Sequence, residues 1–148
     1  MRRIFLWLNM VLTSIVVVGI FVQAYLITAY ITGTSGSQDA LDAHRFLGFS
    51  IIHPLELLVF LTAFGAWPKA WKWIGFTFLL PLIGTIQLFL APPETGDRQS
   101  GWVHGLHGLL ALVVLVMAAI IAHRGMRELG LRQARHGGAD ADMPRSRP

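Results

Sequence analysis

The sequence predicts an all-α protein, a membrane four-helix bundle of up-down topology with the N and C termini in the cytoplasm. Hydrophobic residues make up 54% of the 148 residues and charged residues only 14%, which is far from the profile of a soluble globular domain. Four apolar stretches are each close to the roughly 20 residues that a helix needs to cross a bilayer. Basic residues gather on one side of these stretches. Together the three observations predict a multi-pass protein of the cell inner (plasma) membrane, embedded in the lipid bilayer.

The four expected helices follow the apolar stretches, over residues 4–31, 43–67, 71–91 and 102–123. The first follows Met-Arg-Arg, as the core of a secretory signal would, but it is longer than such a core, and we expect it to be retained as a membrane helix. The second and third are joined by so short a connection that they must be antiparallel neighbours. We therefore expect one transmembrane domain over residues 1–124 and a basic, disordered cytoplasmic tail over residues 125–148.

The distribution of Lys and Arg predicts the orientation of the bundle. With four spans, all but two of the 12 Lys and Arg residues lie on one side, and only Arg45 and Arg98 lie on the other. The positive-inside rule places the basic side, and with it both termini, in the cytoplasm. These topology determinants account for the net charge of +4, so the sequence implies no nucleic-acid partner. Four tryptophans fall near the expected helix ends, as interfacial anchors do: Trp67, Trp71, Trp73 and Trp102.

Histidines open two of the expected helices. His44 and Arg45 begin the second, and His104 and His107 begin the fourth. Ionisable side chains inside a membrane are costly, so such residues indicate a functional site by default. Both helices enter from the outer side, which places the three histidines at similar depth. The chain has no cysteine, which excludes thiolate metal sites and covalent attachment of haem.

Paired histidines on two helices favour a haem b site near the outer face. In an up-down bundle the second and fourth helices are diagonal across the core, and imidazole is a common axial ligand of haem iron. The expected metal ligands are His44 with His107, or His44 with His104. Arg45 or the remaining histidine would contact a haem propionate or a quinone.

Other polar and small residues accompany these histidines. Gln23 and Gln87 fall near the outer ends of the first and third helices, and Gly48, Gly105 and Gly108 lie close to the histidines in sequence. The small residues would let a flat macrocycle approach the backbone. Two other interpretations remain. One is a different metal such as copper or zinc, and the other is a structural cluster of interfacial histidines and closely packed glycines.

A second constellation lies in the middle of the second helix. His53 and Glu56 are spaced i to i+3 and share a face, which predicts an acid–base pair of the kind that serves as a proton relay. His53 follows His44 by nine positions, about 180° around a regular helix, so we expect the two imidazoles not to face one ligand. Pro54 would free a backbone carbonyl about one turn earlier. The structural alternative is a neutral Glu56 bonded to a hydroxyl or imidazole nearby: Thr62, Thr77 or His53.

Two short motifs carry a family resemblance. His44-Arg45-Phe-Leu-Gly48, with Val103-His104-Gly-Leu-His107, resembles one four-helix half of the haem A synthase family. That resemblance implies imidazoles from diagonal helices at one haem, in a single haem-binding half or a homodimer. The chain is one bundle and lacks the acidic residue that precedes His-Arg in that family. The same motif, with Gln23, Gln87 and His104, also resembles a family of small uncharacterised four-helix membrane proteins of actinobacterial type, which brings no established activity.

These observations predict two functions of different classes. The first is a cytochrome b-like protein with bis-His ligation that carries out electron transfer between a quinol and a redox partner. The second is a non-catalytic accessory or small-molecule-binding membrane protein in which histidines and glutamines form a structural network. A proton-coupled transporter is a weaker third, because four helices without internal repeats would have to dimerise. The sequence contains no motif for nucleophilic or phosphate chemistry. The sequence does not decide whether the protein is an enzyme.

Overall fold

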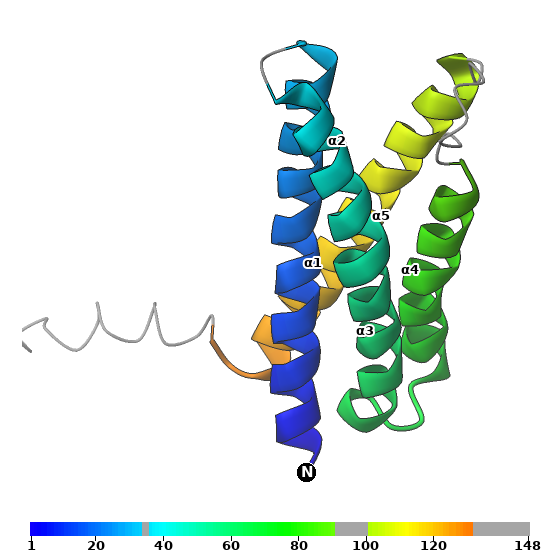
Figure 1. The fold of residues 1–148 in the computed structure, drawn as a ribbon. Coiled ribbons are helices and arrows are strands. Elements are labelled where there is room, and N and C mark those ends of the chain that lie inside the picture. The colour runs from blue at the N-terminus through cyan, green and yellow to red at the C-terminus, as the bar shows by residue number, and fades with distance from the viewer. Residues whose placement is uncertain (34–35, 91–100, 132–148) are drawn as a thin grey trace, which may run out of the picture.

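The computed structural model describes residues 1–33, 36–90 and 101–131, and over these residues it contains helices and no strands (Figure 1). The elements in chain order are α1 (Arg2–Ile31), α2 (Ser37–Phe46), η1 (Leu47–Ile52), α3 (His53–Ala66), α4 (Trp71–Leu90) and α5 (Gly101–Glu128). Because α2, η1 and α3 form one continuous helix, the described residues make four helices long and apolar enough to cross a membrane. The all-α prediction and the four apolar helices are thus confirmed.

Two helices extend beyond the apolar stretches that predicted them. The second begins at Ser37, not near residue 43, and the fourth ends at Glu128, not near residue 123. The added turns are polar, and hydropathy marks only the part of a helix that meets lipid. The helix at Ser37 starts directly after Gly36, whose φ of 85° suits glycine. Of the predicted tail, residues 125–128 are therefore helical, and residues 132–148 lie outside the described residues.

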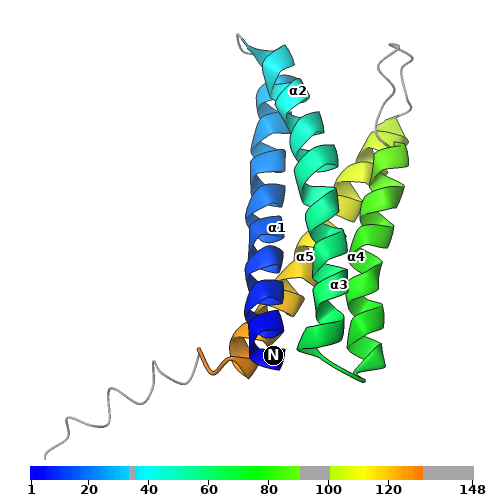
Figure 2. The same ribbon diagram turned by 60° about the horizontal axis from the view of Figure 1, so that its bottom comes forward.

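The helices pack in a ring. α1 contacts α3 and α5, and α4 contacts the same two helices, so α3 and α5 face each other across the core (Figures 1 and 2). Large side chains that are fully buried fill the centre: Val16, Val59, Leu80, Val114 and Ile121. The outside carries many exposed apolar side chains, among them Phe21, Leu61 and Leu112. An apolar exterior around a packed interior is what a protein surrounded by lipid requires.

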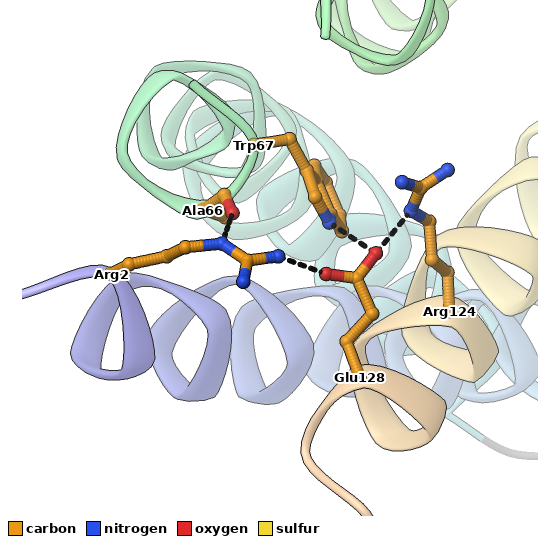
Figure 3. Close-up of polar contacts among 5 residues, drawn as sticks. All are labelled: Arg2, Ala66, Trp67, Arg124 and Glu128. Atoms are coloured by element: carbon orange, nitrogen blue, oxygen red, sulfur yellow. Dashed lines mark hydrogen bonds and ion pairs between the residues drawn. The ribbon is translucent and has the colours of Figure 1, made fainter. Parts of the chain in front are cut away.

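A cluster of charged and aromatic groups joins three helices at the end that holds the N-terminus (Figure 3). Arg2 donates from Nε to the carbonyl oxygen of Ala66 at 3.1 Å and pairs with Glu128 Oε2 at 2.5 Å. The other oxygen of Glu128 accepts hydrogen bonds from Trp67 Nε1 at 3.0 Å and from Arg124 Nε at 2.8 Å. We call these five residues the Glu128 cluster. It ties the start of α1 and the end of α3 to the end of α5.

The tryptophans differ from the expected interfacial anchors in one case. Trp71 and Trp102 are 71% and 90% exposed, but Trp67 is only 2% exposed. The guanidinium of Arg124 lies over the ring of Trp73, 3.9 Å from its centroid, and is 5.3 Å from the ring centroid of Trp67, in the arrangement of cation–π pairs. The anchor prediction is therefore wrong for Trp67, which is part of the protein interior.

The segment η1 changes the rotation of the helix between α2 and α3. It is a π-helix, and the backbone N–H of His53 bonds to the carbonyl oxygen of Gly48, five residues earlier. Pro54 comes next, at the start of α3. A proline has no N–H to donate and its ring crowds the carbonyl four residues earlier, so a wider turn in front of it relieves the conflict. Each residue added to a turn rotates the preceding part of the helix by about 100° relative to the part after it.

Candidate functional site

A cavity of about 610 Å³ lies between the helices. Its wall is mainly apolar, and each of the four long apolar helices adds polar side chains to it. They are Gln23 from α1, His44 and Arg45 from α2, His53 and Glu56 from α3, Thr85 and Gln87 from α4, and His107 from α5. Gly48 also lines the cavity. Of the residues that the sequence singled out as a candidate site, the structure thus brings together all except His104, Gly105 and Gly108.

Two imidazoles face each other in this cavity. His44 and His107 come from the diagonally opposed helices α2 and α5, and their ring centroids lie 6.4 Å apart with planes inclined at 55°. Both side chains are partly buried. The ring opposite His44 belongs to His107.

Hydrogen bonds fix the proton position on both rings. His44 Nδ1 lies 3.2 Å from the backbone oxygen of Gln23, and His107 Nδ1 lies 3.2 Å from the backbone oxygen of Gln87. A carbonyl oxygen can only accept, so each Nδ1 carries the hydrogen and each Nε2 keeps its lone pair. Metal-binding histidines are held in this way, with one nitrogen bonded to a carbonyl and the other presented to the metal.

The two glutamines differ in how they are satisfied. Gln87 Nε2 donates to the backbone oxygen of His107 at 3.0 Å, and His107 Nδ1 donates to the backbone oxygen of Gln87, so the two residues form a reciprocal pair. Gln23 Oε1 is buried and has no hydrogen-bond partner in the part of the chain that the structure describes. Its Nε2 lies against Gly48, where a Cβ atom would come within 2.7 Å. Buried polar atoms are nearly always satisfied, so Gln23 Oε1 is an exception at the edge of the cavity.

His53 lines the same cavity as His44, although we expected from the sequence that the two imidazoles would not face one ligand. The expectation assumed a regular helix with 3.6 residues per turn. The π-helical η1 lies between the two histidines and changes their relative rotation. The sequence signal was Pro54, directly after this turn, but a proline alone does not reveal whether a helix bends or widens.

Glu56 is the most deeply buried acidic group among the described residues that line the cavity. Its residue is 1% exposed, and its Oε2 lies 3.3 Å from His53 Nδ1. Gly84 of α4 leaves the space that the carboxyl occupies, since a Cβ atom there would overlap Oε2. His53 Nε2 in turn lies 3.5 Å from Thr85 Oγ1. The i to i+3 pair predicted from the sequence is therefore in contact.

The other partners considered for Glu56 bond elsewhere. The hydroxyl of Thr62 donates to the backbone oxygen of Leu58 at 2.8 Å, and that of Thr77 donates to the backbone oxygen of Ile74 at 2.8 Å. Thr62 also accepts a hydrogen bond from Asn9 Nδ2 at 3.0 Å. These hydroxyls stabilise the helix interface below the cavity, and His53 is the partner that Glu56 contacts.

His104 lies apart from the cavity. Its side chain is exposed, and the neighbouring Gly105 and Gly108 are exposed with open space where a Cβ atom would be. The expectation that these two glycines admit a flat ligand is therefore wrong, whereas Gly48 does line the cavity. Sequence alone could not separate His104 from His107, since the depth of each was similar and the rotation of α5 was unknown.

The number of side chains that could bind a metal distinguishes between a zinc site and a haem site. Among the described residues no group of three or more His, Asp or Glu side chains is placed to hold a metal ion. A structural or catalytic zinc site uses three or four protein ligands. A haem iron needs two axial ligands, because the macrocycle supplies the others. His44 and His107 are two imidazoles that face each other in the cavity.

Sequence reasoning missed two residues of the cavity, which contact Glu56 and His53. Gly84 gives room to Glu56, and Thr85 contacts His53; in the sequence both have the character of ordinary packing residues in an apolar helix.

Comparisons of the chain with known protein families, with curated proteins and with solved structures found no match. The function is therefore argued from the geometry of the site.

Proposed function

We propose that the protein is a b-type haem-binding electron-transfer protein of the plasma membrane, with His44 and His107 as axial ligands. The observation that carries the proposal is the pair of imidazoles with Nδ1 bonded to carbonyl oxygens, 6.4 Å apart in one cavity. A bond from a metal to an imidazole nitrogen is about 2 Å, so a shared metal holds two ring centroids roughly 6 Å apart. The measured separation fits that requirement.

The remaining groups of the cavity suit the same ligand. Arg45 is a cation at the wall of a mainly apolar cavity, where it would pair with a haem propionate. Gln23 and Gln87 hold the two imidazoles through their backbone oxygens, which fixes ring orientation and raises the basicity of each Nε2. When bound, the haem supplies a one-electron redox centre whose potential depends on such hydrogen bonds and on burial.

The proposed topology is an up-down bundle with both termini in the cytoplasm. The N-terminus and the connection between α3 and α4 lie at one end (Figure 1), with the basic residues Arg2, Lys69 and Lys72. The positive-inside rule assigns that end to the cytoplasm. The cavity then lies toward the outer face, where a quinone or a redox partner would exchange electrons with it.

The resemblance in the His-Arg motif supports this function as well. Haem A synthase and the small four-helix proteins of actinobacterial type share the His-Arg opening at the position of His44 and Arg45, and Gly48 completes the motif. In haem A synthase two such halves make one protein, and a homodimer of this chain would give the same number of helices. Haem A synthesis itself is not part of the proposal.

A second candidate is a non-catalytic accessory or small-molecule-binding protein. The reciprocal bonds between Gln87 and His107 favour it, because they satisfy polar groups without any ligand. In that case the histidines and glutamines form a structural network, and the cavity holds a molecule that undergoes no redox change. The two candidates predict different effects for the same substitution.

The test is a dithionite-reduced minus air-oxidised absorption spectrum of the protein, purified in mild detergent from haem-supplemented cells. We expect a sharp low-spin b-type α-band at about one haem per chain. His44→Ala and His107→Ala should each abolish this band. His104→Ala is the matched control, because His104 is exposed and lies on the same helix as His107, and it should keep the band.

Each other outcome has a defined meaning. Wild-type protein without a Soret band would remove the haem proposal and leave the accessory or binding function. A normal band in His44→Ala would overturn the ligand assignment. For the structural network, His44→Ala should only lower the thermal unfolding temperature in detergent, with no change in colour.

A further inference from the structure

His53 and Glu56 lie in the candidate haem cavity, but the proposed haem ligation does not use them. Glu56 follows His44 by 12 positions, which is about 18 Å along the helix axis. The pair therefore lies near the middle of the bilayer, where an isolated carboxylate is costly. A buried acid of this kind needs a partner. The contacts of His53 show that the imidazole and the carboxyl group share a proton.

The hydrogen bonds of Thr85 determine how many protons the pair holds. The hydroxyl of Thr85 donates to the backbone oxygen of Pro81 at 2.7 Å, so its oxygen can only accept from His53 Nε2, at 3.5 Å. Nε2 therefore carries a hydrogen. The other ring nitrogen, Nδ1, faces Glu56 Oε2 at 3.3 Å. Two lone pairs would repel at that distance, so the contact holds one proton, either on the carboxyl or on the imidazole.

We infer that His53 and Glu56 form a proton-binding site that is coupled to the redox change of the cavity, an inference that rests on the proposed haem function. The contact with one proton corresponds to the reduced protein. In the oxidised protein this proton would be lost, the two lone pairs would move apart, and ionised Glu56 would offset positive charge that a ferric centre leaves in the cavity. When one electron arrives from an external reductant, one proton from water would bind between Nδ1 and Oε2, and the net charge of the cavity would not change. On oxidation the electron leaves to the acceptor and the proton returns to water.

The low polarity of the site favours this coupling. Charges interact far more strongly in a protein interior than in water, and a buried charge without a partner is costly. An added electron without a proton would leave the buried carboxylate without the positive charge at the other end of the same cavity. The mainly apolar wall and the 1% exposure of Glu56 favour uptake of the proton together with the electron.

The other titratable or charged groups around the cavity are few. From α2 they are His44 and Arg45, and from α5 it is His107; the polar side chains that α1 and α4 direct to the cavity, Gln23, Thr85 and Gln87, do not titrate. His44 and His107 are the proposed metal ligands, and Arg45 stays charged at all working pH values. Among the described residues that line the cavity, His53 and Glu56 are thus the pair left to exchange a proton.

The test is the midpoint potential of the haem-loaded protein in detergent, measured by redox titration at a series of pH values. One proton per electron makes reduction tenfold less favourable for each unit of pH increase, which is about 59 mV for a one-electron couple. We expect the wild-type potential to fall toward that slope across the interval in which the pair titrates. Glu56→Gln should lose the slope while it keeps the α-band and the haem content.

Two further variants keep the test decisive. His53→Gln removes the imidazole that shares the proton with Glu56 and should move the pH interval of the slope, so the test stands if Glu56→Gln does not fold; an unmoved interval would overturn the role of the pair. Asp39→Asn is the matched control, because it removes an exposed carboxylate of α2 outside the cavity and should leave the slope unchanged. A second readout needs no haem: the infrared band of a protonated carboxyl in the haem-free protein should be absent from Glu56→Gln.

The outcomes separate this inference from the haem proposal. A bound haem with a flat potential in the wild-type protein would overturn the coupling and leave the haem function in place. An unchanged slope in Glu56→Gln would assign the proton to another group, such as a haem propionate, and also overturn it. Protein that binds no haem would overturn both proposals together.

Discussion

The two ends of the bundle use polar side chains in opposite ways. In the Glu128 cluster, the carboxylate accepts from Arg2, Trp67 and Arg124, so the polar groups bond to one another and close that end of the protein (Figure 3). In the cavity, the hydrogen bonds that hold His44 and His107 use Nδ1 and direct Nε2 elsewhere. There the polar groups surround a space.

This difference separates structural polar residues from candidate functional ones inside a membrane. Asn9 illustrates the structural kind, because it is fully buried and its Nδ2 donates to the backbone oxygen of Val59 at 2.8 Å. Gln23 illustrates the other kind, since it lines the cavity and Asn9 does not; the side-chain oxygens of both amides are buried without a hydrogen-bond partner among the described residues. Both are polar amides in the same apolar helix, so residue type alone does not tell them apart.

The largest loss of stability should come from a substitution in the wall of the cavity, at Gly84. In Gly84→Ala the new Cβ atom would overlap Glu56 Oε2 and come within 3.0 Å of His53 Nδ1. Overpacking of this kind costs about 1–3 kcal/mol. Thermal unfolding in mild detergent should show the loss.

Gly75→Ala is the matched control for Gly84→Ala. Gly75 lies on the same helix, is exposed, and has open space where a Cβ atom would be. Alanine favours a helix over glycine by roughly 0.5–1 kcal/mol, so this variant should be as stable as the wild type or more so. Equal stability of the two variants would mean that Glu56 is not held against α4.

A smaller loss of stability should result from disrupting the Glu128 cluster at the other end of the bundle. Glu128→Ala leaves the buried N–H of Trp67 without its acceptor, and removes the pairs with Arg2 and Arg124. An unsatisfied buried donor costs about 1–3 kcal/mol, and the exposed ion pairs add little, so we expect roughly 1–2 kcal/mol. The haem α-band should stay unchanged, because the cluster lies at the opposite end from the cavity.

The matched control for Glu128→Ala is Arg127→Ala, a charged neighbour on α5 that is exposed and outside the cluster. Its unfolding temperature should equal that of the wild type. A loss of the haem band in Glu128→Ala would show that the two ends are not independent, and would remove the contrast between them.

Hydropathy was sufficient to predict the helices, but not their ends. The spans over Arg2–Ile31 and Trp71–Leu90 nearly match the apolar stretches, because lipid imposes a long uncharged run. The early start at Ser37 and the late end at Glu128 lie in polar turns, where hydropathy gives no signal. The role of Glu128 depends on partners from two other helices, which no local pattern reveals.

The residues of the site were mostly predictable, and their relative rotation was not. A histidine or a glutamine in an apolar run is visible in the sequence because its burial needs a reason. Whether it points inward depends on helix phase. The π-helical turn before Pro54 brings His44 and His53 to one cavity, and the rotation of α5 selects His107 over His104. Both require the tertiary structure.

The smallest predicted effect distinguishes the two glutamines of the cavity. Gln87→Leu removes the donor to the backbone oxygen of His107 and should lower stability by about 1 kcal/mol, as the loss of one hydrogen bond does. Gln23→Leu removes a buried acceptor that has no partner in the described part of the chain, and the backbone oxygen that holds His44 stays in place. The haem-free Gln23→Leu protein should therefore unfold at the same temperature as the wild type or higher. A clear loss of stability in Gln23→Leu would mean that its side chain is structural, and that the cavity resembles the Glu128 cluster more than a ligand site.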